Sequence, residues 1–260
     1  MVNVAVSDSS AGTRTITIDR EEKRNALDRA TCAELLDAFR EAGTSPVVRA
    51  IVLRGAGDRA FCAGADLKEM LAHESIDESR AHFDAVRLII EEMHAVPQPV
   101  ISRVAGFALA GGCGLAVAAD FTMASEGAIF GLPEISLALL PLVVSAPLYR
   151  AMGNRKALLD LVLTGRRVPA AEALTLGLVT RVVPDDRLDL EIGELCDTLC
   201  GLSPVAVRMG KEAIYGMCEM DYHAAMKYLR DVITLTSRTQ DASEGIRAFF
   251  EKRDPKWTGR

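Results

Sequence analysis

Two stretches of small residues have the composition of sites where a ligand contacts the protein backbone. In residues 60–68, an apolar run ends in Ala-Gly-Ala before Asp66 opens a helical pattern. In residues 104–120, a strand-like run leads through a glycine-rich turn into an apolar helix. Small side chains leave backbone N–H groups accessible, and the start of a helix stabilises negative charge. Together the stretches favour a site for developing negative charge, although each alone also fits a tight turn or a closely packed glycine helix.

Other catalytic and ligand-binding patterns are absent from the sequence. The glycine-rich turn matches neither GxGxxG nor GxxxxGK[ST], so two common nucleotide-binding motifs are excluded. The four histidines share no motif with a serine or cysteine nucleophile, and the GxSxG turn of a hydrolase is missing. The six cysteines form no CxxC pair and have no histidine at zinc-ligand spacing. We therefore expect buried, reduced thiols and no metal site.

The elements that would position these stretches alternate between strand and helix in the first part of the chain. Asp28 caps a predicted helix that runs to about Arg40, and a second, amphipathic helix is predicted at residues 78–96. Strand patterns occur at residues 13–19, 47–54, 100–104, 120–124, 128–130 and 178–183. Only helices are predicted after that, at residues 187–202, 204–217, 222–236 and 242–252. This order predicts an α/β core at residues 1–185 and a C-terminal helical region at residues 186–260.

Composition limits the partners of the protein. The 260-residue chain has a formal net charge of −6 and a pI of about 5.4, which argues against nucleic-acid binding. The longest uncharged run, residues 104–119, is too short for a membrane span and contains four glycines. Residues 1–12 lack the basic segment and continuous apolar run of a signal peptide. We expect a cytoplasmic protein with no nucleic-acid or membrane partner.

Six short motifs follow one another along essentially the whole chain. They lie at residues 22–27, 61–68, 106–114, 130–134, 172–179 and 249–253. Together and in this order they resemble the crotonase family, also called the enoyl-CoA hydratase/isomerase superfamily. The resemblance implies an α/β fold, the crotonase-like spiral of repeated ββα units, with a C-terminal helical trimerisation region. It also implies a homotrimer or a dimer of trimers that acts on an acyl-CoA thioester. No separate cofactor is expected, because coenzyme A is part of the substrate.

The resemblance assigns roles to individual positions. Ala65 and Gly111 match the residues whose backbone N–H groups form the family's oxyanion hole. Two such donors stabilise the enolate of a thioester, and losing one typically costs about 10²–10³-fold in rate. Lys23 and Arg24 match a segment that holds coenzyme A, where they can pair with phosphates, although a solvated charge pair is the simpler interpretation. The full set of positions implied to contact the substrate or coenzyme A is Lys23, Arg24, Ala26, Leu27, Ala63, Asp66, Leu67, Phe107, Gly114, Pro133 and Leu142.

The catalytic carboxylates depart from the pattern of the family's hydratases, which typically use two glutamates. The second glutamate matches Glu134, and the first falls at Gly114, which has no side chain. Apolar neighbours should raise the pKa of Glu134, which suits a group that takes and returns a proton. Glu134 also fits a helix start after Pro133. If the missing carboxylate limits hydration, restoring a glutamate at position 114 should speed the hydration of a short enoyl-CoA. Crowding by Leu142, Val143 and Val144 is the expected complication.

A second departure concerns the acyl pocket. The family often has a glycine-rich stretch after the proline matched by Pro141, whereas this chain has Leu-Val-Val-Ser-Ala-Pro. The acyl group is therefore not expected to be the usual linear one. Leu142 stands where the family's dienoyl-CoA isomerases have an acid, which disfavours that reaction.

One carboxylate leaves several reactions open. Hydration or dehydration of an enoyl-CoA comes first, because similar sequences, such as bacterial methylglutaconyl-CoA hydratases, also lack the first glutamate. Isomerisation of a 3-enoyl-CoA to a 2-enoyl-CoA comes second, since mitochondrial enoyl-CoA isomerases use one glutamate at the position of Glu134. Decarboxylation of an acyl-CoA is third. A non-catalytic acyl-CoA-binding protein is an alternative of a different class. The missing carboxylate at Gly114 favours it, and the retained carboxylate of Glu134 disfavours it.

Overall fold

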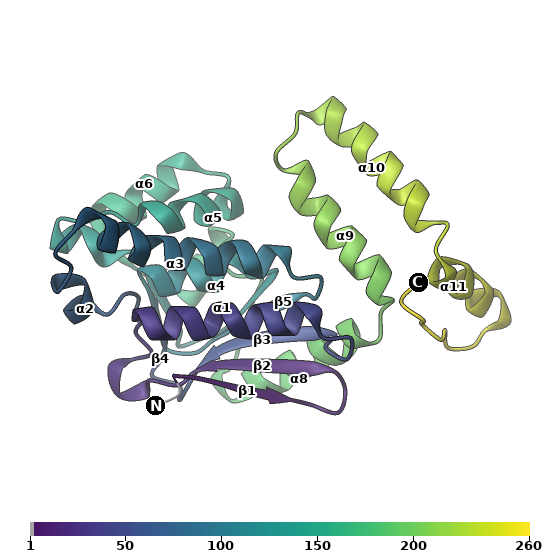
Figure 1. Cartoon of the computed structure of the whole chain (residues 1–260), viewed down its shortest axis with the longest axis horizontal. Coiled ribbons are helices and arrows are strands. Elements are labelled where there is room, and N and C mark those ends of the chain that lie inside the picture. The colour runs from purple at the N-terminus through teal and green to yellow at the C-terminus, as the bar shows by residue number, and fades with distance from the viewer. Residues whose placement is uncertain (1–2) are drawn as a thin grey trace.

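The computed structural model describes residues 3–260, so Met1 and Val2 of the predicted core lie outside the described residues. Two β-sheets form the centre of the chain (Figure 1). The larger sheet has the order β1-β2-β3-β5-β7-β10 and is parallel except for the β1–β2 pair. Its strands are β1 (Val4–Asp8), β2 (Thr13–Ile18), β3 (Ala50–Gly55), β5 (Val100–Val104), β7 (Phe121–Ser125) and β10 (Arg181–Val183).

The smaller sheet has the order β4-β6-β8-β9, and only its β8–β9 pair is antiparallel. Its strands are β4 (Ala60–Cys62), β6 (Phe107–Leu109), β8 (Ile129–Gly131) and β9 (Arg167–Pro169). Along the chain, β3, β5 and β7 of the larger sheet are each followed by a strand of the smaller sheet and then by helix. This repetition confirms the predicted ββα units.

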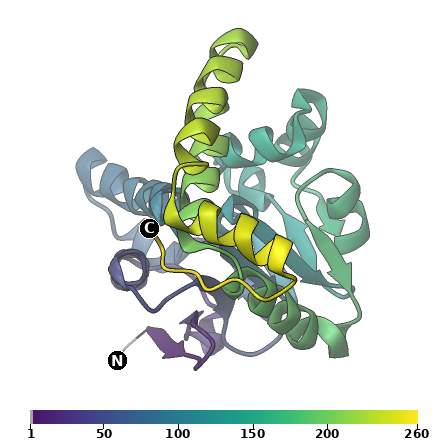
Figure 2. The ribbon, with the colours of Figure 1, turned by 90° about the vertical axis from the view of Figure 1, so that its right-hand side faces the viewer.

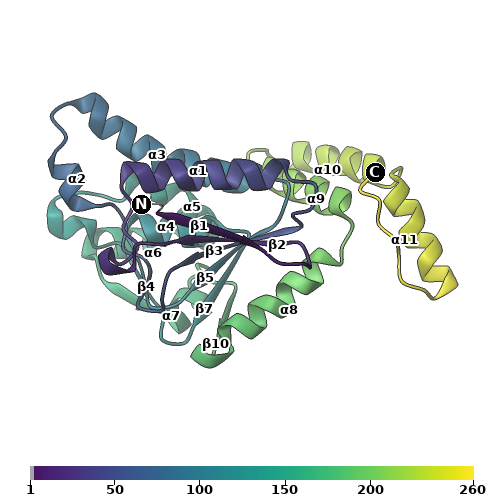
Figure 3. The same ribbon diagram turned by 60° about the horizontal axis from the view of Figure 1, so that its bottom comes forward.

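Helices cover both faces of the larger sheet (Figure 3). On one face, α1 packs against α3, and α3 and α5 both contact α4. On the other face, Leu188, Ile192 and Cys196 of α8 pack against buried residues of the sheet. The helices of this part are α1 (Arg29–Thr44), α2 (Leu67–Leu71), α3 (Ile76–Ala95), α4 (Gly111–Ala118), α5 (Leu142–Met152), α6 (Arg155–Thr164), α7 (Ala170–Thr175) and α8 (Leu188–Cys200). Short 3-10 helices are η1 (Glu21–Lys23), η2 (Pro133–Leu137) and η3 (Asp185–Arg187).

The last three helices extend away from the sheets (Figures 1 and 2). They are α9 (Pro204–Met217), α10 (Tyr222–Thr236) and α11 (Gln240–Glu251). Lys211 of α9 connects them to the core, because its buried ammonium group lies 2.8 Å from Asp120 and donates to the carbonyls of Met93 and Gln98. Helix α10 has no buried residue. The predicted division at residue 186 stays a prediction, and α8, which lies beyond it, packs on the sheet.

Most of the predicted elements are present, with shifted ends. The amphipathic helix starts at Ile76 rather than 78, because Ser75 and Glu78 form a capping box. The strand predicted at 178–183 begins only at Arg181, since the Leu178 N–H bonds to Ala173 at the end of α7. Strand β1 was not predicted; its residues after Val4 are exposed and give no buried pattern. No helix in the described part is long and apolar enough to cross a membrane.

Candidate active site

The two segments predicted to hold coenzyme A lie side by side. Leu27 and Ala65 form an isolated parallel β-bridge. The Ala63 N–H donates to the Arg24 carbonyl at 3.0 Å, and the Asp66 N–H donates to the Leu27 carbonyl at 2.8 Å. The Leu27 N–H donates to the Gly64 carbonyl at 2.8 Å, so the bridge uses the Gly64 carbonyl and the Asp66 amide on either side of Ala65. Its own N–H points away from the bridge partner, as the alternation of an extended chain requires.

The glycine-rich turn meets this segment at the start of α4. Gly111 is the first residue of the helix, and Ala110 before it has φ 53°, a conformation that L residues rarely adopt. Gly64 has φ 92°, and a Cβ atom at Gly64 would lie 2.6 Å from the Ala110 Cβ and 3.2 Å from the Gly111 nitrogen. Glycine is therefore required at position 64. The contact places the Ala65 and Gly111 amides next to each other.

Both amides are available to a ligand. Among the described residues, neither the Ala65 N–H nor the Gly111 N–H donates a hydrogen bond. Gly111 also lies at the positive end of the α4 dipole, which favours a negatively charged oxygen. Two adjacent, unpaired backbone donors have the arrangement of an oxyanion hole.

Glu134 follows a strand of the smaller sheet that is bonded to the same turn. Gly131 ends β8, and its carbonyl accepts a 2.9 Å hydrogen bond from the Ala110 N–H, directly before the oxyanion residue. Pro133 then starts η2, which carries Glu134 in its first turn. One carboxylate oxygen of Glu134, Oε2, is buried and has no hydrogen-bond partner among the described residues. Burial raises the pKa of Glu134 above its ordinary value of 4.5.

The structure shows how Gly114 is packed. This residue is buried, and a Cβ atom there would lie 2.2 Å from Cγ1 of Val144 in α5. Gly114 therefore packs directly against Val144, and its contact with the substrate stays a prediction. A glutamate cannot be restored at position 114 while Val144 is present, because the two side chains would occupy the same space.

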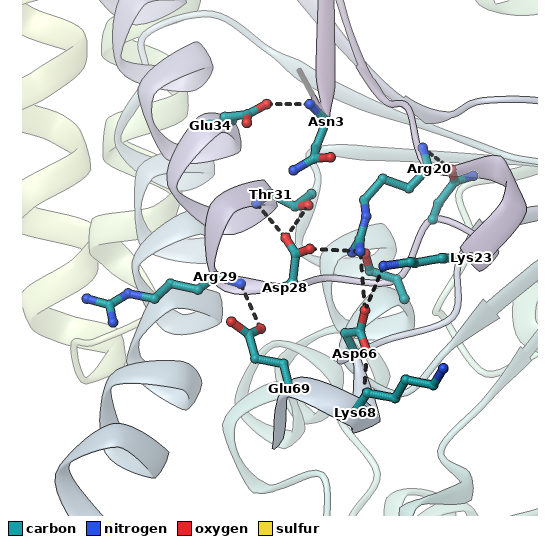
Figure 4. Close-up of polar contacts among 12 residues, drawn as sticks. Asn3, Arg20, Lys23, Asp28, Arg29, Thr31, Glu34, Asp66, Lys68 and Glu69 are labelled. Carbon is teal, nitrogen blue, oxygen red and sulfur yellow. Dashed lines mark hydrogen bonds and ion pairs between the residues drawn. The ribbon is translucent and has the colours of Figure 1, made fainter. Parts of the chain in front are cut away.

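An ion-pair network joins the two segments that are predicted to hold coenzyme A (Figure 4). Asp66 caps α2 through the Lys68 N–H, and its carboxylate lies 3.2 Å from Arg20 and 3.7 Å from Lys23. Arg20 is only 4% exposed; it also pairs with Asp28 at 2.7 Å and donates to the Ala26 carbonyl. Sequence reasoning missed Arg20. The only signal in the sequence was a single arginine directly after a buried strand.

The remaining predicted residues lie around this centre, with different degrees of exposure. Lys23 and Arg24 are exposed, and Ala26 is buried below them. Phe107 lies on β6 under the guanidinium group of Arg167, 5.4 Å from its ring centroid. Around Glu134 the chain exposes apolar side chains, namely Ile135, Leu137, Leu140 and Leu142. The described residues contain no group of three or more His, Cys, Asp or Glu that could hold a metal ion.

Comparisons with known proteins show which family the chain belongs to. Residues 8–260 match the family model described as enoyl-CoA hydratase/isomerase. A protein of Mycobacterium bovis named probable enoyl-CoA hydratase echA8 is 42% identical over 246 residues, which are 94% of each chain. Carnitinyl-CoA dehydratase of Salmonella enteritidis is 36% identical over 94% of each chain. The crystal structure of an enoyl-CoA hydratase from Bacillus anthracis is 35% identical, with a TM-score of 0.94 over 99% of this chain and 100% of that one. The chain therefore belongs to the enoyl-CoA hydratase/isomerase family and has the crotonase fold.

Proposed function

We propose that the protein is an enzyme that adds water to an enoyl-CoA thioester, or removes it in the reverse direction. The observation that carries the proposal is the meeting of two unpaired backbone N–H groups, at Ala65 and Gly111, beside the half-buried Glu134. In this arrangement the two amides bind the thioester oxygen and Glu134 transfers the proton.

The reaction uses one carboxylate in two steps. Ionised Glu134 takes a proton from water while the water oxygen bonds to the β-carbon, and the double-bond electrons move onto the thioester oxygen. The Ala65 and Gly111 amides stabilise that enolate, a contribution worth about 10²–10³-fold per donor. Protonated Glu134 then gives its proton to the α-carbon, and the thioester carbonyl re-forms. A raised pKa suits both steps, because the group must accept and then release a proton.

The surroundings support an acyl-CoA substrate. Lys23 and Arg24 are exposed cations at the edge of the paired segments, where phosphates of coenzyme A would bind. At the other side of the site, Ile135, Leu137 and Leu142 expose apolar surface suited to an acyl chain. The relatives named above as hydratase or dehydratase favour water addition or removal over isomerisation and decarboxylation.

We also propose the trimer, or dimer of trimers, that the family resemblance implies. Helices α10 and α11 expose many large apolar side chains, an unusual surface for a monomer. These side chains are Tyr222, Met226, Ile233, Leu235, Ile246, Phe249 and Phe250. Light scattering coupled to gel filtration measures the mass, and a monomer at micromolar concentration would contradict the proposal.

An activity panel tests the proposed reaction. The protein is incubated with crotonyl-CoA, a 3-enoyl-CoA and a carboxyacyl-CoA, and products are identified by mass spectrometry. We expect gain of one water by crotonyl-CoA. If only an isomerised product or only a decarboxylated product forms, and no hydrated one, the enzyme is an isomerase or a decarboxylase and the proposed hydration is wrong. The free acids should not bind, because they lack the nucleotide part that Lys23 and Arg24 contact.

A further inference from the structure

The two backbone donors of the site are held in different ways. Gly111 belongs to a regular helix of 8 residues, α4, whose own hydrogen bonds fix its first turn. Ala65 lies between β4 and α2, outside the strands of both sheets. Its bridge to Leu27 consists of two hydrogen bonds, which use the Gly64 carbonyl and the Asp66 amide. Because an oxyanion donor must be placed within about 0.5 Å, the Ala65 segment needs further support.

Arg20 holds both sides of this bridge (Figure 4). Its guanidinium group donates to the carbonyl of Ala26 and lies 2.7 Å from the carboxylate of Asp28, and these two residues flank the bridge residue of one segment. It also donates at 3.2 Å to Asp66, which directly follows Ala65 in the other segment. Arg20 is 4% exposed, so water and salt screen these contacts little. One buried side chain therefore ties together the two segments whose pairing orients the Ala65 N–H.

The charges around Arg20 show why the tie is needed. Burial opposes ionisation of Asp28 and Asp66, but hydrogen bonds and nearby cations lower the pKa of both carboxyls below 3.8. Both are therefore negatively charged at neutral pH, and they repel each other. Lys23 approaches Asp66 at 3.7 Å, but its side chain is exposed, so its charge is more strongly screened. Without Arg20, two like charges would face each other across the bridge and push its segments apart.

We propose that Arg20 is a positioning residue, which fixes the distance and direction of the Ala65 N–H by clamping the segments on either side of the bridge. The proposal rests on the proposed function, because it takes Ala65 as an oxyanion donor. Arg20 acts through Ala26 and Asp66, not by contact with the thioester. Asp66→Asn leaves the clamp in place, because the asparagine oxygen still accepts a hydrogen bond from Arg20.

Infrared spectroscopy of a bound thioester tests this role without turnover. Butyryl-CoA has no double bond to hydrate, and an isotopic label identifies the stretching band of its thioester carbonyl. Hydrogen bonds from the oxyanion donors weaken the C=O bond, so the band should lie at lower frequency in the wild-type complex than in free butyryl-CoA. Arg20→Met should lose a clear part of this shift, because one of the two donors is misplaced. A full wild-type shift in folded Arg20→Met would overturn the proposal.

The rate of crotonyl-CoA hydration gives a second readout. A misplacement of about 1 Å in a catalytic group lowers a rate about 10²-fold. Arg20→Met should therefore lower kcat about 10²-fold, with a smaller change in KM. An increase in KM alone, with kcat as in the wild type, would mean that Arg20 serves only the binding of coenzyme A and would overturn its role in placing the donor.

Arg14 is the matched control for the loss of a buried arginine. It is 7% exposed, lies on β2 and likewise pairs with two carboxylates, Asp8 at 2.8 Å and Glu41 at 3.3 Å. Arg14→Met should lower the midpoint of urea unfolding, as Arg20→Met does, but should leave the carbonyl band and kcat unchanged. An equal loss of the band shift in both variants would make it an effect of general destabilisation and would overturn the proposal.

A second variant covers the case that Arg20→Met does not fold. Combining Arg20→Met with Asp28→Asn and Asp66→Asn leaves no buried charge unpaired, and asparagine keeps both helix caps. This variant still lacks the guanidinium group that ties the two segments. It should therefore lose the same part of the band shift, and a full wild-type shift would refute the role of Arg20.

The proposed reaction and the role of Arg20 can fail separately. A band shift that is present in the wild type and reduced in Arg20→Met supports the role of Arg20, even if the protein hydrates no enoyl-CoA and the proposed reaction is wrong. Efficient hydration with the same band shift in both proteins would support the reaction and reject the role of Arg20. A wild-type complex whose band lies at the frequency of free butyryl-CoA would contradict both.

Discussion

Changing Glu134 to glutamine removes the ionisable group and keeps the size and shape of the side chain. Gly114 supplies no acid from α4, so no second carboxylate from that position compensates. General acid–base catalysis by one positioned group contributes about 10²–10⁴-fold. Because the same carboxylate serves both proton transfers, we expect kcat to fall towards the upper end of that range. A loss of about 10³–10⁴-fold corresponds to about 4–5.5 kcal/mol of transition-state stabilisation.

The same variant should not lose stability. Burial raises the pKa of Glu134 in the folded state above 4.5, so the protonated form is favoured there. The stability that this group contributes is fully present below the unfolded pKa and is lost as the pH rises through the folded pKa. Glutamine, which carries no charge at any pH, removes that loss. Above the folded pKa, Glu134→Gln should therefore be at least as stable as the wild type.

Two measurements test the expected loss of rate and the expected stability of Glu134→Gln. Hydration of crotonyl-CoA is followed over a range of pH, and urea unfolding is measured at pH 4 and pH 8. The wild-type rate should fall as the pH drops through the raised pKa of Glu134. The residual activity of the variant should not show this decrease at low pH. Glu126→Gln, at an exposed turn, is the matched control. Activity of Glu134→Gln within a few-fold of the wild type would show that another group transfers the proton.

Three further predictions concern the backbone donors, the coenzyme A segments and the C-terminal helices. Gly111→Pro removes one N–H at a helix position where proline is tolerated, so kcat should fall about 10²–10³-fold in a folded protein, whereas Gly111→Ala keeps the donor and should be mild. Asp66→Asn removes the charge that faces Arg20, so KM for the thioester should rise with little change in kcat; equal effects on both would contradict a role in binding. Burial opposes ionisation of Asp66, but hydrogen bonds lower its pKa overall, so this pairing should persist until the pH falls below 3.8. Lys211→Met leaves Asp120 without its buried cation and should cost about 3–5 kcal/mol in the free energy of unfolding by urea, and an unchanged midpoint would show that α9 is held by other contacts.

Local patterns were enough to predict most elements and the chemistry-bearing segments. Asp28 and Asp66 are helix caps in the structure, as their positions before helical patterns predicted. Pro133 starts the short helix that carries Glu134. These features depend on residues within a few positions of one another, so their physical cause is contained in a short stretch of sequence. The same holds for α9 and α10, which begin and end where they were predicted.

Contacts between distant segments were decided only by the tertiary structure. Arg20 gives only a weak local signal, yet it is buried between Asp28 and Asp66, the residues that cap the starts of α1 and α2. Gly114 illustrates the same limit. The sequence determined that a carboxylate is missing there, and it named Leu142, Val143 and Val144 as residues that could crowd a restored one. Whether position 114 has space for it depends on how α5 packs on α4, and the structure places Val144 in that space, because close packing leaves no unfilled volume at a helix contact.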